Sequence, residues 1–294
     1  MQLPDLWADP STRRKYLAEK LSDGAICLVL GSGVSKPFGL PLWDELLRRM
    51  FEGHESDRPV TLDLRRQAEF FKVKFCGNDN ATFMERVGDA LYRGFSLDLE
   101  SLKKNRLLSV IAALSTKAAG RRGGVVISFN YDDLLESFLA LSGFDVRSVA
   151  EERYWRRASD VEVWHPHGFI PCAQAGRASK RIVLDQAEYS LIVGDDRHPW
   201  RQRLLSQMRS SVCIFVGLSL TDDNLDSLMI RAHETHAAKD TSTAFWGVWL
   251  TTTLEPAAHE MARSRGVFPL VVDDYSQFAD ELAEVVKIAT DGTA

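Results

Sequence analysis

Polar residues of the types that position a ligand or transfer a proton follow an apolar run near the middle of the chain. Asn130 and Asp132 stand directly after the apolar run 125–129, and apolar residues return at helical spacing from Leu134. Both side chains are therefore predicted at the carboxyl end of a strand, where open α/β sheets bind their ligands. The alternative is that Asp132 or Asp133 only caps the following helix.

Two histidines follow another strand-length run, residues 161–164. If the strand continues, alternation puts His165 and His167 on one face, which is also the geometry of a His-x-His metal site. A lone histidine is usually structural. A ring with a reference pKa of about 6.5 can nevertheless act as a general base near neutral pH.

Two glycine-containing turns end the remaining candidate strands. The apolar run 26–30 stops at Gly31-Ser32-Gly33, and the run 211–216 stops at Gly217, two residues before Ser219. Glycines at such a turn let the backbone approach a phosphate, and the amides of the turn supply hydrogen-bond donors. The spacing fits neither the dinucleotide fingerprint nor the P-loop. Glycines that serve only a tight turn are the alternative.

No metal site is predicted. The cysteines are far apart and contain no Cys-x-x-Cys pair, which excludes a four-thiolate zinc site formed by local spacing and gives no disulfide framework. They are Cys27, Cys76, Cys172 and Cys213.

The elements that must position these residues alternate along the chain. The 294 residues can hold one large α/β domain or a domain with an insertion. Helical spacing of apolar residues dominates from Leu42 to about Gly120. We predict a Rossmann-like parallel sheet with helices on both faces, formed by residues 1–43 and 121–294, and an inserted helical module at residues 44–120. A further short strand is predicted at residues 181–184.

Charge and composition argue against several classes of protein. A hydrophobic content of 45% with 26% charged residues is ordinary for a globular protein. The net charge of −5 argues against a protein that coats nucleic acid, so the basic, aromatic stretch 143–160 is interpreted as a solvated loop or a partner surface. No signal peptide is evident, and no apolar run approaches the ~20 residues of a spanning helix, so a cytoplasmic location and no membrane contact are predicted.

Taken together, the turns resemble the cofactor-binding motifs of the sirtuins in their order along the chain, over residues 24 to about 230. The first motif is Gly-x-Gly-x-Ser followed by Gly-x-Pro and an aromatic residue, where Trp43 stands in place of the family's Phe and Asp44 in place of its Arg. Phe-Asn-Tyr-Asp at 129–132, His-Gly at 167–168 and Gly-Leu-Ser at 217–219 resemble the others. The Asn-Tyr-Asp form is typical of bacterial sirtuin-like NAD hydrolases.

The resemblance implies NAD as the substrate and a role for each matched residue. Asn130 would orient the nicotinamide ribose and the attacking water, Asp132 would contact the carboxamide, and His167 would be the general base or the partner of a ribose hydroxyl. Trp43 would line the nicotinamide side. The residues expected to bind NAD are Gly31, Ser32, Gly33, Ser35, Pro41, Trp43, Gly217 and Ser219.

Hydrolysis of NAD to ADP-ribose and nicotinamide is the predicted reaction, because the zinc module with Cys-x-x-Cys pairs that accompanies protein deacylation is missing. The resemblance also implies an anti-phage defence effector that drains cellular NAD, a form of abortive infection. The alternatives are a non-catalytic NAD or ADP-ribose sensor, a deacylase, and a serine hydrolase. The last would use Ser219 of Gly-x-Ser-x-Thr with His259 and Asp273.

Such an enzyme would need low basal activity. From the length of the sequence we expect a catalytic domain and the helical module without a separate sensor domain. The expected switch is therefore assembly: a homo-oligomer formed through the helical module, which meets a HerA-type ATPase or another phage-sensing partner.

Overall fold

The computed structural model describes residues 6–119, 124–151, 159–172, 178–239 and 245–292. The basic, aromatic cluster Arg153, Tyr154, Trp155, Arg156 and Arg157 lies outside these residues, as does the predicted domain boundary at 121.

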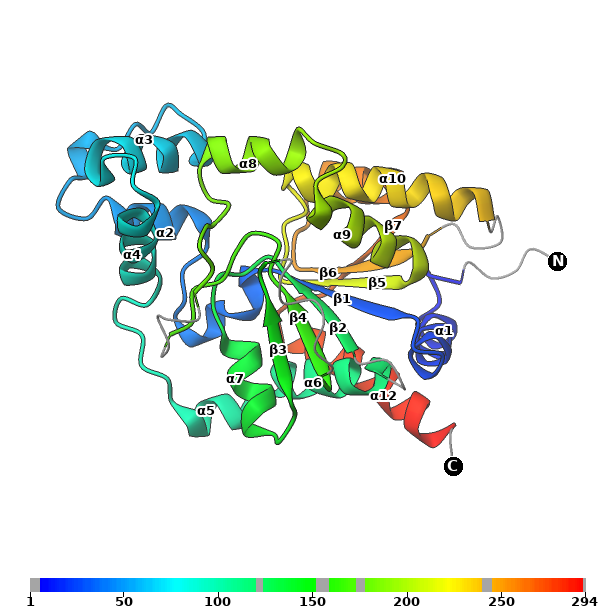
Figure 1. The fold of residues 1–294 in the computed structure, drawn as a ribbon. Coiled ribbons are helices and arrows are strands. Elements are labelled where there is room, and N and C mark those ends of the chain that lie inside the picture. The colour runs from blue at the N-terminus through cyan, green and yellow to red at the C-terminus, as the bar shows by residue number, and fades with distance from the viewer. Residues whose placement is uncertain (1–5, 120–123, 152–158, 173–177, 240–244, 293–294) are drawn as a thin grey trace.

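Seven parallel strands form one sheet in the order β3-β4-β2-β1-β5-β6-β7 (Figure 1). β1 is central and pairs with β2 on one side and β5 on the other, with Leu30 opposite Ser128 and Val216. The predicted Rossmann-like α/β fold is confirmed. The strands are β1 Ile26–Leu30, β2 Gly124–Ser128, β3 Val146–Val149, β4 Val161–Trp164, β5 Val212–Val216, β6 Gly247–Thr251 and β7 Val267–Val271.

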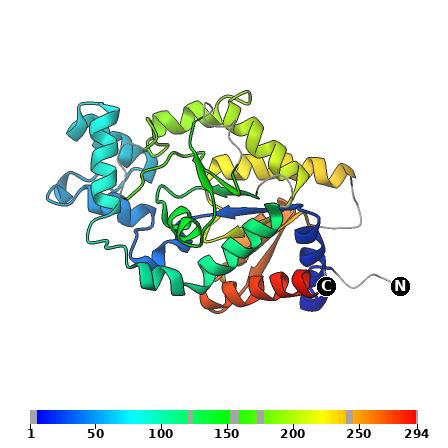
Figure 2. The same cartoon turned by 60° about the horizontal axis from the view of Figure 1, so that its bottom comes forward.

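Helices cover both faces of the sheet because successive residues of each strand point to opposite sides. Leu28 and Leu30 of β1 share a core with one set of helices, whereas Cys27 and Val29 face the other set. Figures 1 and 2 show α1, α6 and α12 grouped on one face. That face carries α1 Pro10–Ser22, α6 Arg106–Ala119, α7 Leu134–Leu141 and α12 Ser276–Asp291, and the other carries α9 Pro199–Ser210, α10 Asp223–Lys239 and α11 Pro256–Ser264.

Three helices near the N-terminus have a core of their own. Apolar residues of α2 Trp43–Met50, α3 Leu64–Cys76 and α4 Asn80–Leu91 pack together and against Ile170, Ile182 and Leu184. Asp63 and Asp79 cap α3 and α4 by accepting hydrogen bonds from backbone amides.

The remaining helices connect this group to the sheet. α5 Leu99–Lys104 contacts α6 and α7, and α6 packs on β1, β2 and α12, so it is part of the sheet layers. α8 Gln186–Val193 contacts α3. The division at residues 44 and 120 stays a prediction.

The predicted strand at 181–184 is wrong. This segment carries no strand structure, and it crosses the loops after β2 and β4 instead of joining a sheet edge. The amide of Val183 donates to the His167 carbonyl at 2.8 Å, and the Tyr131 hydroxyl donates to the Val183 carbonyl at 2.7 Å.

Across the described ranges, no helix has both the length and the apolar character that crossing a bilayer requires.

Candidate active site

A cavity of about 800 Å³ lies where the turns after β1, β2, β4 and β5 meet. The carboxyl ends of parallel strands face the same edge of a sheet, so the topology collects the predicted residues there. Those that line the cavity are Gly31, Ser32, Gly33, Pro41, Trp43, Asn130, Asp132, His167, Gly217 and Ser219. Ser35, also predicted, does not line the cavity but donates a hydrogen bond to Asp132, which does.

The glycines of the first and fourth turns pack backbone against backbone. The amide of Gly33 donates to the Gly217 carbonyl at 3.0 Å. A β-carbon on Gly33 would lie 2.7 Å from the Gly217 α-carbon, and one on Gly31 would lie 2.5 Å from the Gly217 carbonyl oxygen. Gly217 has φ of +70°. Glycine is required here for close approach of two loops and for one left-handed conformation.

This packing occupies backbone amides that would otherwise be able to donate hydrogen bonds to a phosphate. The amides of Gly33, Val34 and Ser35 donate to the carbonyls of Gly217, Gly31 and Ser32. The close-packing alternative therefore accounts for these glycines, and other groups must hold a phosphate in this conformation.

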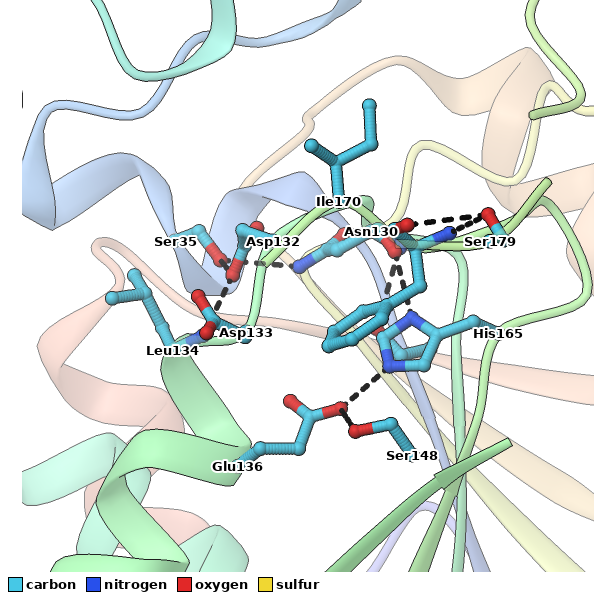
Figure 3. A network of polar contacts seen from close by, with 12 residues as sticks. Ser35, Asn130, Asp132, Asp133, Leu134, Glu136, Ser148, His165, Ile170 and Ser179 are labelled. Carbon is cyan, nitrogen blue, oxygen red and sulfur yellow. Dashed lines mark hydrogen bonds and ion pairs between the residues drawn. The ribbon is translucent and has the colours of Figure 1, made fainter. Parts of the chain in front are cut away.

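A chain of buried hydrogen bonds joins the first and second turns (Figure 3). Ser35 Oγ donates to Asp132 Oδ1 at 3.0 Å and accepts from Asn130 Nδ2 at 3.2 Å. The Ser35 hydroxyl donates its one hydrogen to the carboxylate, so its oxygen can accept the hydrogen bond from the side-chain amide of Asn130. The carboxamide oxygen of Asn130 accepts no hydrogen bond from any described residue and is left for a ligand.

Asp132 serves the helix as well as the cavity. The Leu134 amide at the start of α7 donates to its Oδ1 at 3.2 Å, whereas Asp133, the N-cap residue, makes no side-chain capping bond. Burial raises the pKa of Asp132 to about 6, against the lowering effect of the bonds from Ser35 and Leu134. Asp133 instead accepts from the Cys172 amide at 3.1 Å.

The two histidines do not share an environment, because β4 ends at Trp164. His165 is 0% exposed, with Nδ1 3.0 Å from the Asn130 carbonyl and Nε2 2.6 Å from Glu136 Oε1 (Figure 3). Burial lowers the pKa of His165, but the adjacent Glu136 carboxylate and the Asn130 carbonyl raise it above its ordinary value.

His167 lines the cavity and is in contact with aromatic rings. Phe129 lies edge-on to it with centroids 4.8 Å apart, and Tyr189 is 6.2 Å away. Its Nε2 is buried and has no hydrogen-bond partner among the described residues. Burial lowers the pKa of His167, and Asp222 only partly opposes this, so the ring is neutral at neutral pH.

Trp43 begins α2 and lines the cavity beside Pro41. Its indole Nε1 is a second buried nitrogen with no partner in the described part of the chain. A buried polar atom without a hydrogen-bond partner is costly, so a bound ligand would satisfy both His167 Nε2 and Trp43 Nε1.

Ser219 is exposed at the cavity mouth, and its Oγ lies 2.7 Å from Thr221 Oγ1. The ring of His259 instead bonds the Thr253 carbonyl at 2.8 Å. No histidine of the described residues contacts Ser219, so the arrangement lacks the base that a serine nucleophile needs.

Metal-ligating side chains do not gather in the part of the chain that the structure describes: no three of His, Cys, Asp or Glu lie close enough to hold an ion there. Cys27, Cys76 and Cys213 are buried and Cys172 is exposed, all as free thiols.

Sequence reasoning missed Glu136, Ser148 and Tyr189. Glu136 lies in the first turn of α7 and bonds His165, and Ser148 of β3 donates to Glu136 at 3.1 Å. Tyr189 accepts a bond from the Asn224 amide at the start of α10.

Comparison with known proteins relates part of the chain to one domain family. Residues 124–267 match the model of the SIR2-like domain, and this range contains Asn130, Asp132, His167, Gly217 and Ser219. No curated protein matches the chain.

Solved structures similar to the chain include Sir2 proteins. One is a Sir2 homologue in complex with NAD, 12% identical, with a TM-score of 0.50 and coverage of 95% of each chain. Another, from work on the mechanism and regulation of Sir2 enzymes, is 14% identical with a TM-score of 0.48, covering 95% of this chain and 98% of the other. The chain therefore contains a region similar to the SIR2-like domain and has the fold of a Sir2 homologue.

Proposed function

We propose that the protein is an NAD hydrolase that releases nicotinamide and ADP-ribose. The observation that carries the proposal is that Asn130, Asp132 and His167, from two separate turns, line one cavity at the carboxyl edge of the sheet. The SIR2-like match over residues 124–267 supports the same reading of these residues.

The cavity suits a dinucleotide. Its volume of about 800 Å³ is in the upper part of the range for ligand pockets, and it extends from Trp43 and His167 to Tyr275 beyond β6. The similar structure that contains NAD supports this choice of ligand. The unpartnered indole N–H of Trp43 would find an acceptor on the ribose or the carboxamide, and the unpartnered Nε2 of His167 would accept from a hydroxyl of the ligand or from the attacking water.

The chemistry requires positioning and one base. Nicotinamide leaves as a neutral group, so the protein must hold the ribose, exclude loose water and orient one nucleophile. Asn130 presents its carboxamide oxygen to a ribose hydroxyl or to the attacking water. The lowered pKa of His167 keeps its Nε2 lone pair able to accept a proton at neutral pH. A sensor that only binds NAD would need no neutral base at this place.

Hydrolysis is favoured over deacylation of lysine because the sequence has no Cys-x-x-Cys pair for a zinc module. The competing serine hydrolase is disfavoured by the separation of Ser219 from His259.

Product analysis tests the proposal. Purified protein is incubated with NAD, and nicotinamide and ADP-ribose are quantified by chromatography. We expect equal amounts of the two products from the wild type and none above background from Asn130→Ala. Asn80→Ala, the same substitution at the start of α4 and away from the cavity, is the matched control and should behave as wild type. NAD consumption that is equal in Asn130→Ala and the wild type would refute the proposal.

A cytoplasmic effector of anti-phage defence is the biological role we propose, with NAD depletion as the output. Assembly through the segment 44–120 into a homo-oligomer that meets a HerA-type ATPase or another phage-sensing partner would supply control. Val60, 73% exposed, and Val73, 58% exposed, are apolar side chains of this segment that such a contact would cover.

The mass in solution and NAD turnover, each with and without the partner, test this role. A protein that is strictly monomeric, fully active alone and harmless to cells with normal NAD would contradict it.

A further inference from the structure

His165 is a buried side chain for which the proposed reaction has no direct use. It does not line the cavity, and its ring lies beneath Asn130 between that residue and α7 (Figure 3). Its nitrogens contact Asn130 O at 3.0 Å and Glu136 Oε1 at 2.6 Å. The ring of Phe169 packs on it with centroids 4.6 Å apart.

The partners fix the protons on the ring. A carbonyl oxygen only accepts, so Nδ1 must carry a hydrogen and donate it to Asn130. Nε2 and Glu136 then share a second proton, and Ser148 Oγ donates to the same carboxylate oxygen at 3.1 Å. The ring therefore cannot rotate without breaking two buried hydrogen bonds.

Asn130 is consequently held at both ends. His165 holds its backbone carbonyl, and Ser35 holds its side-chain Nδ2 at 3.2 Å. Asn130 follows the end of β2 and lies outside the strand, so ladder hydrogen bonds do not fix this peptide. The bond from His165 takes their place.

We propose that His165 and Glu136 form a positioning pair, in which Nδ1 of His165 fixes the Asn130 carbonyl so that the Asn130 side chain meets the ribose and water in the reactive geometry. This rests on the proposed NAD hydrolysis. Asp132 and Asp133 are the other charged groups near the pair. Neither residue of the pair touches the substrate.

Two substitutions of His165 separate the two contacts. Asn places an amide near the Nδ1 position and can still donate to the Asn130 carbonyl, whereas Gln places its amide near the Nε2 position and keeps only the Glu136 contact. We expect His165→Gln to lower kcat about 100-fold with KM within about threefold, because small displacements of a reacting group cost that much. His165→Asn should stay within about fivefold of wild-type kcat.

A second pair of variants, at Glu136, tests the same proposal if the His165 variants fail to fold. Glu136→Gln can donate to Nε2 of a neutral ring and should keep kcat near wild type, whereas Glu136→Ala frees the ring and should lower kcat about tenfold or more. Unchanged kcat in both His165→Gln and Glu136→Ala, or equal loss within both pairs, would overturn the proposal.

A readout without turnover separates this proposal from the proposed function. The chain has five asparagines, so selective ¹⁵N labelling gives a simple spectrum, in which the Asn130 side-chain signal is the one lost in Asn130→Ala. The signal should shift or broaden in His165→Gln and stay in His165→Asn. If the wild type is inactive but the Asn130 signal changes only in His165→Gln, NAD hydrolysis is refuted and the positioning role of His165 stands. If the signal is the same in both variants and the wild type, the positioning role is overturned.

Discussion

The cavity has two halves that are built differently. The glycine half, Gly31, Gly33 and Gly217, is held by backbone contacts with no space for a side chain. In the polar half, Asn130 and Asp132 are held by side-chain hydrogen bonds, and His167 packs against aromatic rings. This half carries buried groups that lack partners or resist ionisation. The glycine half therefore serves shape and stability, and the polar half contains the groups that the proposed reaction would use, at a cost in stability.

The largest effect is expected in the polar half. His167→Ala should lower kcat/KM about 10²- to 10⁴-fold, because it removes the proposed base. The melting temperature should change little relative to this loss. His54→Ala, an exposed histidine after α2, is the matched control. Wild-type turnover in a folded His167→Ala protein would remove His167 from the mechanism.

Substitution of Asp132 tests whether ionisation of this buried carboxyl group lowers the stability of the fold at neutral pH. Its folded pKa of about 6 exceeds the ordinary 3.8, so the folded state binds its proton more tightly and loses stability as pH rises between these values. At pH above 6, Asp132→Asn should increase the free energy of unfolding by up to about 3 kcal/mol, from about 1.4 kcal/mol per pKa unit. The gain should vanish below pH ~4.

Ionisation of Asp132 should also set the pH dependence of the activity. With Asp132 required as a carboxylate, kcat/KM should fall as pH drops through about 6. Unfolding curves and pH profiles measured on Asp132→Asn and the wild type give both results. A variant that is less stable than the wild type at pH 7.5 would show that the bonds to Ser35 and Leu134 outweigh burial.

The glycine half should respond through stability. Gly217→Ala and Gly39→Ala both place alanine at positive φ, which costs about 1–2 kcal/mol. Gly39 has open space, but at Gly217 a β-carbon would lie 2.7 Å from the Val34 amide nitrogen, so a further loss of about 1–3 kcal/mol is expected there. Equal losses in denaturant unfolding would contradict the close packing.

The smallest effect is expected at Ser219, which lies at the mouth. Ser219→Ala should raise KM for NAD about two- to tenfold with kcat unchanged, the value of one ordinary hydrogen bond. Steady-state kinetics measure this. Loss of all turnover would instead favour the serine hydrolase.

Sequence alone predicted the sheet and the convergence of the polar residues, because apolar runs that end in glycine, asparagine or histidine mark strand ends that a parallel sheet brings together. It missed β3, where Arg147 and Ser148 make an edge strand look polar. The apolar residues at 181–184 predicted a strand. In the structure these residues pack on loops and on the α2–α4 core instead.

The contacts of His165 with the Asn130 carbonyl and with Glu136 were not predicted from the sequence. His165 and Glu136 are 29 residues apart in the sequence, and only the end of β4 at Trp164 turns the histidine toward α7. Alternation along a continued strand would have placed it with His167.

The most direct test of the account is the time course of NAD incubated with the wild type and with Gly39→Ala, Asn130→Ala and His167→Ala, followed by proton NMR at saturating NAD and high protein concentration. The account predicts nicotinamide and ADP-ribose in equal amounts from the wild type and from Gly39→Ala, and intact NAD with the two polar-half variants. Intact NAD with the folded wild type in every assembly state, or equal consumption by all four proteins, would contradict it.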